Sequence, residues 1–211
     1  MIELLFYRYL VTKLHLTLKE KWAFNPFAGV LENDLEKIII AKFDVESMLK
    51  QIQQSESIAI EFVGRQGRGK TSNLMYLQKQ IPQYPIFLLN ANTKAVKLFQ
   101  NKSEIVFVDS IHHLSIFDRL KLFRTKKVIV YTTHWSRKLE CILVGKKHQA
   151  IRFKGITKEV LRRILNKRLQ FAAINKLKPK DKFTDQESYQ LIQQFGDNYR
   201  GIINHLYEKY Q

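Results

Sequence analysis

A glycine-rich loop between an apolar segment and a helical pattern constrains the fold of this chain more than any other feature. Residues 64–71 read Gly-Arg-Gln-Gly-Arg-Gly-Lys-Thr and fit the pattern G-x-x-x-x-G-K-[ST] at every specified position. Residues 58–63 before the loop have the composition of a strand, and residues 71–77 after it that of a helix. A strand, a glycine loop and a helix in this order predict an α/β fold with an anion site at the start of the helix.

The residue types in the loop match the chemistry of a nucleotide phosphate. Glycines let backbone N–H groups curl around a β-phosphate without a Cβ in the way. Lys70 is expected to reach the β- and γ-phosphates, and the Thr71 hydroxyl is a hard oxygen ligand of the kind that Mg²⁺ prefers. The predicted nucleotide-binding residues are Gly64, Gly67, Arg68, Gly69, Lys70, Thr71 and Ser72.

Asp109 follows four apolar residues, 105–108, and is the second chemical signal. A carboxylate at the end of a buried strand is typical of the Mg²⁺ site of P-loop NTPases, so Thr71 and Asp109 are the predicted metal ligands. The 38 residues between Lys70 and Asp109 leave room for one further strand–helix unit. Ser110 stands where a hydrolysing enzyme of this kind usually has Glu, and serine cannot act as a general base at neutral pH.

Two interpretations of Ser110 stay open. Either another group orients the attacking water, or hydrolysis is slow and the protein acts mainly as a nucleotide-dependent switch. Candidates for the other group are His112, His113 and Glu61. A structural role is the simpler explanation for each of them, and Glu61 in particular lies within the first predicted strand.

Short apolar segments alternate with helical patterns from residue 58 onward. Strands are predicted at 58–63, 86–89, 105–108, 128–131 and 150–153, which implies a parallel sheet with helices on both faces. Helices are predicted at 43–52, with Asp44 as N-cap, at 157–177, at 184–195 and from there to the end. Three parts follow: an N-terminal helical and extended segment (1–52), a P-loop α/β domain (53–155) and a small helical lid (156–211).

Two further segments carry polar side chains where a nucleotide site would need them. Residues 127–131 lead into Thr132, Thr133 and His134, which would place a threonine near the γ-phosphate; strand-end capping is the alternative. Arg200 opens a helix after the break at 196–198 and would direct its guanidinium at the nucleotide from the lid.

These four elements in this order resemble those of the AAA+ ATPases, and among them the initiator and transposition-helper branch. Residues 157–169 are similar to the helix that opens the lid in that branch, and Asn25-Pro26-Phe27 is similar to an entry motif ahead of the core. Residues 196–211 are similar to the end of uncharacterised bacterial AAA-type ATPases, many of them cyanobacterial. The resemblance covers residues 24–211.

The resemblance implies ATP and Mg²⁺ as cofactors and gives single residues a role. Lys70 and Asp109 would act with Thr133 as the first sensor, Thr132 being the alternative, and with Arg200 as the second sensor. A neighbouring subunit of a homo-oligomer would supply an arginine finger, for which Arg137 is the first choice and Arg124 the alternative.

The net charge of +17 is concentrated in one stretch of the chain. Residues 1–110 carry +3, residues 111–184 carry +16 and residues 185–211 carry −2. Such a block indicates a polyanionic partner, although each basic cluster alone is also compatible with a solvated surface. The residues predicted to touch nucleic-acid phosphates are Arg119, Lys121, Arg124, Lys126, Lys127, Arg162 and Arg163, and further basic positions are Lys146, Lys147, Arg152, Lys154, Lys167 and Arg168.

The remaining features concern the setting of the protein. A single cysteine, Cys141, excludes an internal disulfide and a Cys-based metal site, and favours a reducing, cytoplasmic setting. Residues 1–18 are apolar but interrupted by charged residues, which predicts an amphipathic helix that docks on protein rather than a membrane anchor.

The leading functional hypothesis is therefore an ATP-dependent switch that oligomerises on nucleic acid. The second is a protein-interaction or signalling ATPase, in which the N-terminal segment and the Asn25-Pro26-Phe27 turn recruit a protein partner. A small-molecule kinase is a third class, and the helical lid with Arg200 fits it less well.

Overall fold

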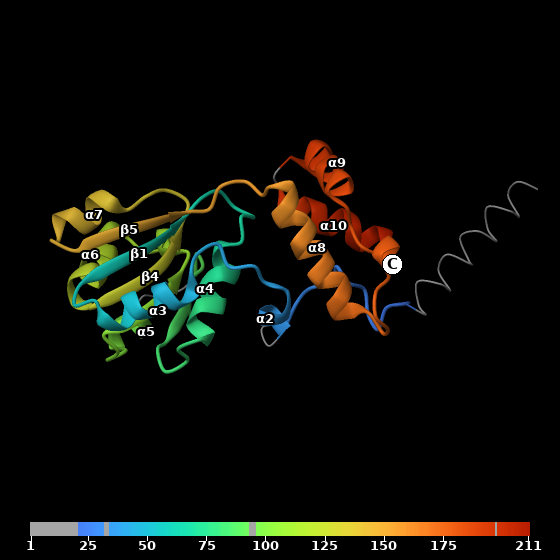
Figure 1. Cartoon of the computed structure of the whole chain (residues 1–211). Coiled ribbons are helices and arrows are strands. Elements are labelled where there is room, and N and C mark those ends of the chain that lie inside the picture. Colours follow the sequence, from blue (N-terminus) through green and yellow to red (C-terminus); the bar gives the residue numbers. More distant parts are fainter. Residues whose placement is uncertain (1–20, 32–33, 93–95, 197) are drawn as a thin grey trace, which may run out of the picture. The chain divides into compact units, whose positions relative to one another are not determined.

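The structure is a computed structural model that describes residues 21–31, 34–92, 96–196 and 198–211. These residues form two compact units (Figure 1). The sheet unit is Ala41–Lys154, and the helical unit combines the described residues up to Ile40 with Gly155–Gln211. Each unit has its own hydrophobic core and is described separately.

Five strands form the sheet, in the order β2-β3-β4-β1-β5. They are β1 (Ile58–Val63), β2 (Ile86–Leu88), β3 (Ile105–Asp109), β4 (Val128–Thr133) and β5 (Lys147–Arg152). Each neighbouring pair is parallel, so the carboxyl ends of the strands lie along one edge. Val63 at the end of β1 is level with Thr133 of β4 and Arg152 of β5.

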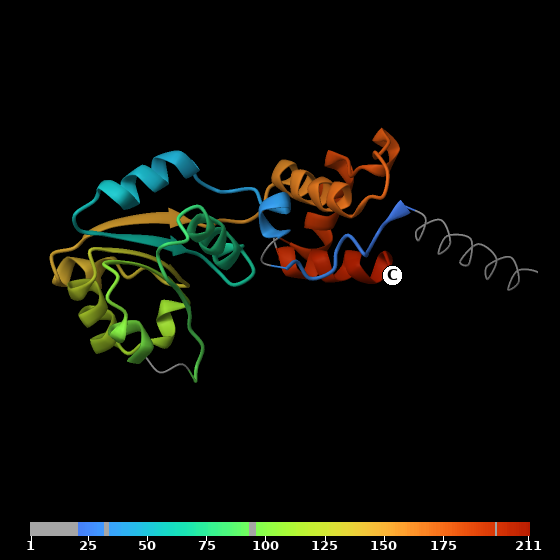
Figure 2. The same cartoon turned by 90° about the horizontal axis from the view of Figure 1, so that it is seen from below.

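Helices cover both faces of this sheet, as Figure 2 shows. On one face α3 (Val45–Gln54) and α4 (Lys70–Lys79) pack on the alternate strand residues that include Ile60 and Phe62. On the other face α5 (Val96–Gln100), α6 (Ile116–Thr125) and α7 (Lys138–Leu143) pack on the set that includes Ala59 and Tyr131. Both faces of β1, β3 and β4 are buried because these strands are mostly apolar, whereas the edge strands β2 and β5 are partly exposed.

The predicted α/β class, with its parallel sheet, is therefore confirmed. All five predicted strands exist, and the Asp44 carboxylate caps α3 by accepting a hydrogen bond from the Ser47 amide at 2.6 Å. Cys141 is fully buried in α7, and this burial raises its pKa to about 11.

The helical unit consists of α8 (Lys158–Ala172), α9 (Asp185–Phe195) and α10 (Tyr199–Lys209), with the short α2 (Leu35–Ile38). Its core is built on Leu161, Leu165 and Leu169 of α8 and is completed by Trp22 and Phe27. The Thr184 hydroxyl accepts a hydrogen bond from the Glu187 amide and thereby caps α9, as predicted.

Helix α8 ends earlier than the predicted 157–177. Its last carbonyl, of Ala172, accepts a hydrogen bond from the Ala23 amide, and Ala173 forms a β-bridge with Trp22. The Ile174 amide then bonds to the Lys21 carbonyl. Pairing with the N-terminal segment therefore replaces the last turns of the helix, and a pattern read along one segment could not reveal this partner.

The two units also divide residues 1–52 differently from the predicted parts. Residues 41–52 belong to the sheet unit, because Met48 and Ile52 of α3 pack in its core. The described residues before 41 belong to the helical unit, because Trp22 and Phe27 pack there. The helix predicted at residues 1–18 lies outside the described residues. None of the described helices has the length and apolar character needed to cross a membrane.

Candidate nucleotide-binding site

The glycine loop joins β1 to α4 at the carboxyl edge of the sheet. The Gly64 amide donates to the Thr133 carbonyl, and the Phe153 amide donates to the Val63 carbonyl at 2.7 Å, so the chain after β5 lies directly against the loop. Gly67 and Gly69 have φ values of 77° and 81°, in the left-handed region that favours glycine. Glycine is needed at position 64 because of the close approach of Phe153, and at positions 67 and 69 because their backbone is left-handed.

Gly64 leaves no room for a side chain. An ideal Cβ there would lie 2.4 Å from the Phe153 carbonyl oxygen, a backbone atom that cannot move alone. We therefore expect Gly64→Ala to lower the free energy of unfolding by about 1–3 kcal/mol, as overpacking does. Urea denaturation measures this, with Gly29→Ala as the matched control, since nothing lies within 4 Å of that position. Equal unfolding free energies of Gly64→Ala and Gly29→Ala would contradict the close approach of the Phe153 carbonyl to position 64.

Lys70 begins α4 and turns its ammonium group back into the loop. Its Nζ donates to the Gly64 carbonyl at 2.7 Å and to the Arg65 carbonyl at 2.9 Å. Burial lowers the pKa of Lys70, the Asp109 carboxylate acts in the opposite direction, and the Arg68 guanidinium lowers it further. The loop thus holds a nearly buried cation, with backbone carbonyls as its partners in this state.

Asp109 is the centre of a cluster of oxygen atoms contributed by three elements. Its Oδ1 accepts hydrogen bonds from Thr71 Oγ1 of α4 at 2.9 Å and from Thr132 Oγ1 of β4 at 2.7 Å. The Ser110 amide donates to Thr132 Oγ1 at 2.8 Å, which fixes that hydroxyl. A carboxylate and a hydroxyl in contact form a hard-oxygen donor set that fits Mg²⁺.

Of the two threonines at the end of β4, Thr132 is the one that contacts Asp109. The Thr133 hydroxyl donates instead to the Trp135 carbonyl at 3.0 Å. Both side chains are almost fully buried. Thr132, the alternative in the sequence-based prediction, therefore lies beside the predicted metal ligand, whereas Thr133 fixes the chain that leads to α7.

Ser110 has an unusual backbone conformation. Its φ of 59° and ψ of 48° are left-handed, and it is the one non-glycine residue with positive φ in the described part of the chain. Its hydroxyl donates to Asp109 Oδ2 at 3.2 Å. The side chain at this position thus supports the carboxylate, and the turn it makes begins the short 3₁₀ helix Ile111–His113.

Glu61 is engaged elsewhere and does not substitute for a catalytic Glu. It is fully buried in β1, where its Oε1 accepts hydrogen bonds from the Tyr131 hydroxyl at 3.0 Å and from the Arg137 amide at 2.6 Å. His148 Nε2 lies 3.3 Å from its other oxygen. Glu61 therefore holds the start of α7 against β1, which agrees with the structural interpretation.

Three histidines lie together beside the loop. The ring of His112 is 4.3 Å from that of His113 and 4.7 Å from that of His134, centroid to centroid. His134 Nδ1 lies 3.4 Å from the Gly64 carbonyl oxygen. The described residues contain no group of three or more His, Cys, Asp or Glu able to hold a metal ion, so these rings pack against one another rather than form a metal site.

Burial lowers the pKa of His112, and His113, His134 and Arg137 add to this effect. A lowered pKa means that the unfolded chain takes up the proton more readily, so stability is lost as the pH falls below about 6.5. We expect the unfolding free energy of His112→Gln to fall less between pH 7.5 and 5.5 than that of the unmodified protein. Chemical denaturation at several pH values tests this, and identical pH profiles would contradict it.

Arg137 and Arg200, the remaining predicted site residues, belong to different units. Arg137 precedes α7, is half-buried, and has its Nη1 3.3 Å from Glu140 Oε1. Arg200 is exposed in the first turn of α10 in the helical unit. The sheet unit alone brings together Lys70, Thr71 and Asp109.

Several basic residues predicted to touch nucleic acid are internal instead. Arg119 is buried and forms two hydrogen bonds with Glu140, from Nε at 2.7 Å and from Nη2 at 2.9 Å. Lys126 donates to the Asn101 and Ser103 carbonyls, and Lys146 donates to the Lys126 and Lys127 carbonyls. Arg119 and Lys126 of the predicted set, and Lys146 among the further basic positions, therefore bind groups of the protein itself rather than face a phosphate backbone.

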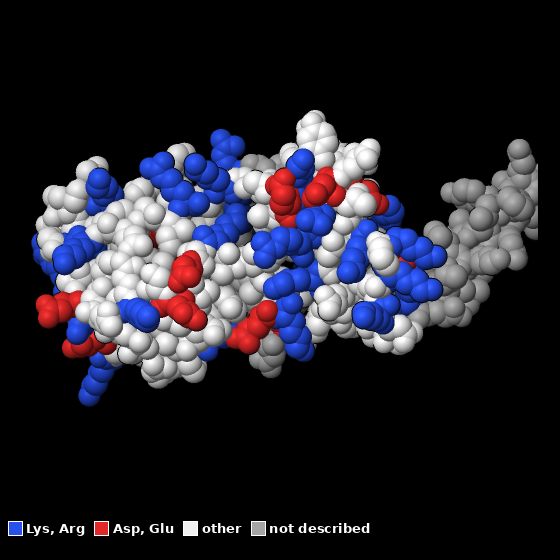
Figure 3. Space-filling model, viewed as in Figure 1, with Lys and Arg blue, Asp and Glu red and all other residues white. Residues whose placement is uncertain are grey.

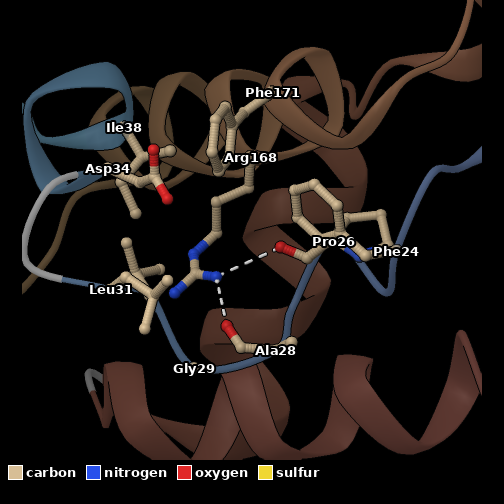
Figure 4. A pocket seen from close by; sticks show the side chains of 10 residues that line it. Phe24, Pro26, Ala28, Gly29, Leu31, Asp34, Ile38, Arg168 and Phe171 are labelled. Atoms are coloured by element: carbon tan, nitrogen blue, oxygen red, sulfur yellow. Dashed lines mark hydrogen bonds between the residues drawn. The ribbon is translucent and has the colours of Figure 1, made fainter.

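Arg168 is the corresponding case in the helical unit. It lies in the wall of an apolar cavity of about 260 Å³ (Figure 4). Its Nη1 donates to the Pro26 and Ala28 carbonyls at 3.1 Å each, and its Nε lies 3.3 Å from the Tyr199 hydroxyl. Arg168 therefore fastens the N-terminal segment to α8 and is not part of an exposed basic stripe.

The exposed members of the predicted set are fewer. Lys121, Arg124 and Lys127 are exposed in the sheet unit and Arg163 in the helical unit, while Arg162 is half-exposed and pairs with Asp185 at 2.8 Å. Glu140, which binds both Arg119 and Arg137, was missed by the sequence reasoning. A structural role for Glu140 could have been inferred from the sequence, because it is one of only four acidic residues in the basic stretch 111–184.

No protein-family model and no curated protein matches the chain, but solved structures do. A point variant of RuvB from Thermotoga maritima matches 84% of this chain and 62% of its own, with 13% identity and a TM-score of 0.52. The T. maritima RuvB Holliday junction branch migration motor matches 81% and 64%, with 12% identity and a TM-score of 0.50. The chain therefore shares the fold of these RuvB structures.

Another AAA+ neighbour is DnaA from Aquifex aeolicus bound to AMPPCP. It matches 79% of this chain and 66% of its own, with 16% identity and a TM-score of 0.49. The chain spans somewhat less than two thirds of the length of each of these AAA+ structures.

Proposed function

We propose that the chain is an ATP-binding AAA+ ATPase that hydrolyses slowly and works as a nucleotide-dependent switch. The observation that carries this proposal is the joint placement of Lys70, Thr71, Thr132 and Asp109 at the carboxyl edge of the sheet. Lys70 would exchange its two carbonyl partners for β- and γ-phosphate oxygens, which are stronger acceptors because they are charged.

Thr71 and Asp109 would hold Mg²⁺, which bridges the β- and γ-phosphates when bound and neutralises the charge that develops there. The backbone amides of residues 64–70 and the amino end of α4 would surround the β-phosphate. Thr132 would keep the Asp109 carboxylate oriented through its 2.7 Å hydrogen bond.

Slow hydrolysis follows from the residue next to Asp109. The Ser110 hydroxyl donates to Asp109 Oδ2, so it is neither a base nor free to orient water toward the γ-phosphate. Glu61 is buried in contacts within the sheet unit. An enzyme with binding groups in place and without a general base leaves its bound nucleotide unhydrolysed for longer, which suits a switch.

Subunit assembly and nucleic-acid binding are the finer parts of the proposal. Thr133 or Thr132 would serve as the first sensor, Arg200 as the second and Arg137 as the arginine finger, in a homo-oligomer that closes around ATP. Figure 3 shows Lys and Arg side chains gathered on the sheet unit around the loop after β1 and the end of β5. Arg65, Arg152 and Lys154 are exposed there, and Lys121, Arg124 and Lys127 are exposed on and after α6.

Nucleic-acid binding is tested by fluorescence anisotropy of labelled single- and double-stranded oligonucleotides at stepped salt concentrations, with and without a non-hydrolysable ATP analogue. We expect binding that weakens steeply with salt and strengthens with nucleotide. Lys121→Ala combined with Arg124→Ala should reduce the salt slope by about two, one for each lost phosphate contact. Lys50→Ala, on an exposed face of α3, is the control. No binding at about 50 mM salt would exclude this part of the proposal.

The alternative is a protein-interaction ATPase that does not bind nucleic acid. The Asn25-Pro26-Phe27 turn does not favour it, because Phe27 is buried against Phe183 and Tyr210 and the Asn25 amide donates to the Tyr207 carbonyl. A partner could reach this turn only by displacing Phe27 from the core of the helical unit. A different surface, on α7, favours protein binding more directly.

A further inference from the structure

Helix α7 and the residues before it expose large apolar side chains next to one another. Trp135 is 78% exposed, Leu139 75%, Leu143 71% and Ile142 57%. The last three follow the spacing i, i+3 and i+4, so they lie on one side of the helix. Single exposed apolar residues are ordinary, but a contiguous group of this size marks an interaction surface. We call Trp135, Leu139, Ile142 and Leu143 the α7 face.

The opposite side of α7 is firmly attached to the sheet unit. Cys141 is fully buried against the sheet, and Glu140 accepts two hydrogen bonds from Arg119 of α6 and one from Arg137. The Arg137 amide is held by the buried Glu61 carboxylate. The exposed side chains therefore stand on a fixed backbone, and a partner would lose little entropy in ordering this surface.

The exposed charged residues of α6, α7 and β5 are all basic. Exposed basic residues on α6, α7 and β5 include Arg124, Lys138, Lys147 and Arg152, whereas Lys121 of α6 lies over the Phe99 ring of α5. The acidic residues of the same elements are Glu140, which is paired with Arg119, and Asp118, which accepts a hydrogen bond from the Ser115 hydroxyl. Figure 3 likewise shows mainly uncharged atoms over α7, with Lys and Arg at the edges.

The apolar α7 face and the basic residues around it together favour one class of partner over the others. A second copy using the same face would place basic rims against each other, which disfavours that pairing. Nucleic acid would match the rim, but three aliphatic side chains have no π-face on which bases stack. An amphipathic helix with acidic residues beside its apolar stripe matches both the centre and the rim.

We propose that the α7 face is a docking surface for an acidic amphipathic helix of another protein. The side chains of Leu139, Ile142 and Leu143 would pack against its apolar stripe, with Trp135 as the aromatic anchor. Its Asp and Glu residues would face Lys138 and the basic residues of α6. The α7 face lies outside the proposed ATP site of its own subunit, although it adjoins Arg137, the proposed arginine finger, and its occupation needs no nucleotide.

The test uses the full chain and two synthetic 18-residue helical peptides with Leu at i, i+3, i+4 and i+7. One carries Glu at the positions beside this stripe and the other carries Lys there, with Ala and Gln at the remaining positions so that both peptides stay helical. We expect saturable binding of the Glu peptide, measured by anisotropy, at least tenfold tighter than that of the Lys peptide at low salt. The emission of Trp135 should shift to the blue, since Trp22 is already buried.

Leu139→Ser combined with Ile142→Ser should weaken Glu-peptide binding at least tenfold, because the substitutions remove the centre of the surface. Ile174→Ser, which changes an exposed residue of the helical unit, is the matched control and should leave binding unchanged. Thermal unfolding of the double variant should equal that of the unmodified protein, since both side chains are exposed.

Four results would overturn the proposal. One is no binding of the Glu peptide, and another is equal binding of both peptides. A third is concentration-dependent self-association in sedimentation that the double variant loses, which would assign the face to a second copy. The fourth is binding to vesicles of anionic lipid that the double variant loses, which would assign it to a membrane surface. ATP binding is measured separately, so either proposal can fail alone.

Discussion

Replacing Lys70 by alanine is expected to weaken ATP binding at least about 100-fold. Lys70 would make charge-assisted hydrogen bonds to the β- and γ-phosphates, and each such bond contributes about 1.5–3 kcal/mol. Two of them together correspond to a factor of 10² or more in Kd. Isothermal titration of Mg·ATP into the unmodified protein and into Lys70→Ala measures the difference.

Lys50→Ala is the matched control for this experiment, because Lys50 is an exposed lysine on α3 of the same unit. It removes the same charge and should leave ATP affinity unchanged. Steady-state phosphate release should also fall to the background rate in Lys70→Ala. Equal ATP affinity of Lys70→Ala and the unmodified protein would mean that the loop does not hold the phosphates.

The largest expected effect on stability comes from Arg119. Removing its guanidinium leaves Glu140 as a buried carboxylate without its bidentate partner, since both side chains are about nine-tenths buried. Breaking a buried pair from one side costs about 3–5 kcal/mol. We therefore expect Arg119→Ala to lower the unfolding free energy by that amount in urea denaturation.

Arg124→Ala, five residues further along α6, is the matched variant with an exposed arginine. Its unfolding free energy should stay within about 0.5 kcal/mol of the unmodified protein. Comparing the unfolding free energies of the two variants distinguishes a buried, structural arginine from an exposed arginine in the same helix. If Arg119→Ala were as stable as Arg124→Ala and instead lost nucleic-acid binding, the original assignment of Arg119 to the nucleic-acid surface would be restored.

The sheet unit could be predicted from the sequence to a large extent. Its central strands are mostly apolar on both faces, so composition alone marks Ile58–Val63 and Ile105–Asp109, whereas the edge strand Lys147–Arg152 is largely polar. The Asp44 cap of α3 and the Thr184 cap of α9 were also readable, because capping is local. Interactions between residues three or four positions apart, such as these caps, can be predicted well from a single sequence.

Features of the helical unit that depend on contacts between distant segments could not be predicted from the sequence. The end of α8 depends on Ala23 and Trp22, which lie about 150 residues away in the sequence. The division of residues 1–52 between two cores likewise depends on contacts of Phe27 and Ile52 with distant segments. No pattern within a window of the sequence contains these partners.

The basic stretch was read correctly as a concentration of charge and incorrectly as a uniform surface. Lys126 and Lys146 satisfy backbone carbonyls at the ends of helices and strands, and Arg119 satisfies Glu140. Long basic side chains can reach such carbonyls from the surface while their stems pack inside. Counting Lys and Arg therefore overestimates the charge that is available to a polyanion.

For the candidate site, the sequence predicted residue types and positions but could not give the direction of each side chain. Thr132 and Thr133 are adjacent and chemically identical, and only the alternation of the strand decides that Thr132 faces Asp109. The left-handed backbone at Ser110 was also not predictable, since serine gives no signal for it.

Residues 64–71 and Asp109 are proposed to hold Mg·ATP, and a crystal structure of the chain with a non-hydrolysable ATP analogue and Mg²⁺ would show whether they do. We expect Lys70 Nζ to leave the Gly64 and Arg65 carbonyls for phosphate oxygens, with Mg²⁺ against Thr71 Oγ1 and the Asp109 carboxylate. A nucleotide bound elsewhere, or Lys70 still bound to the two carbonyls at saturating analogue, would contradict it.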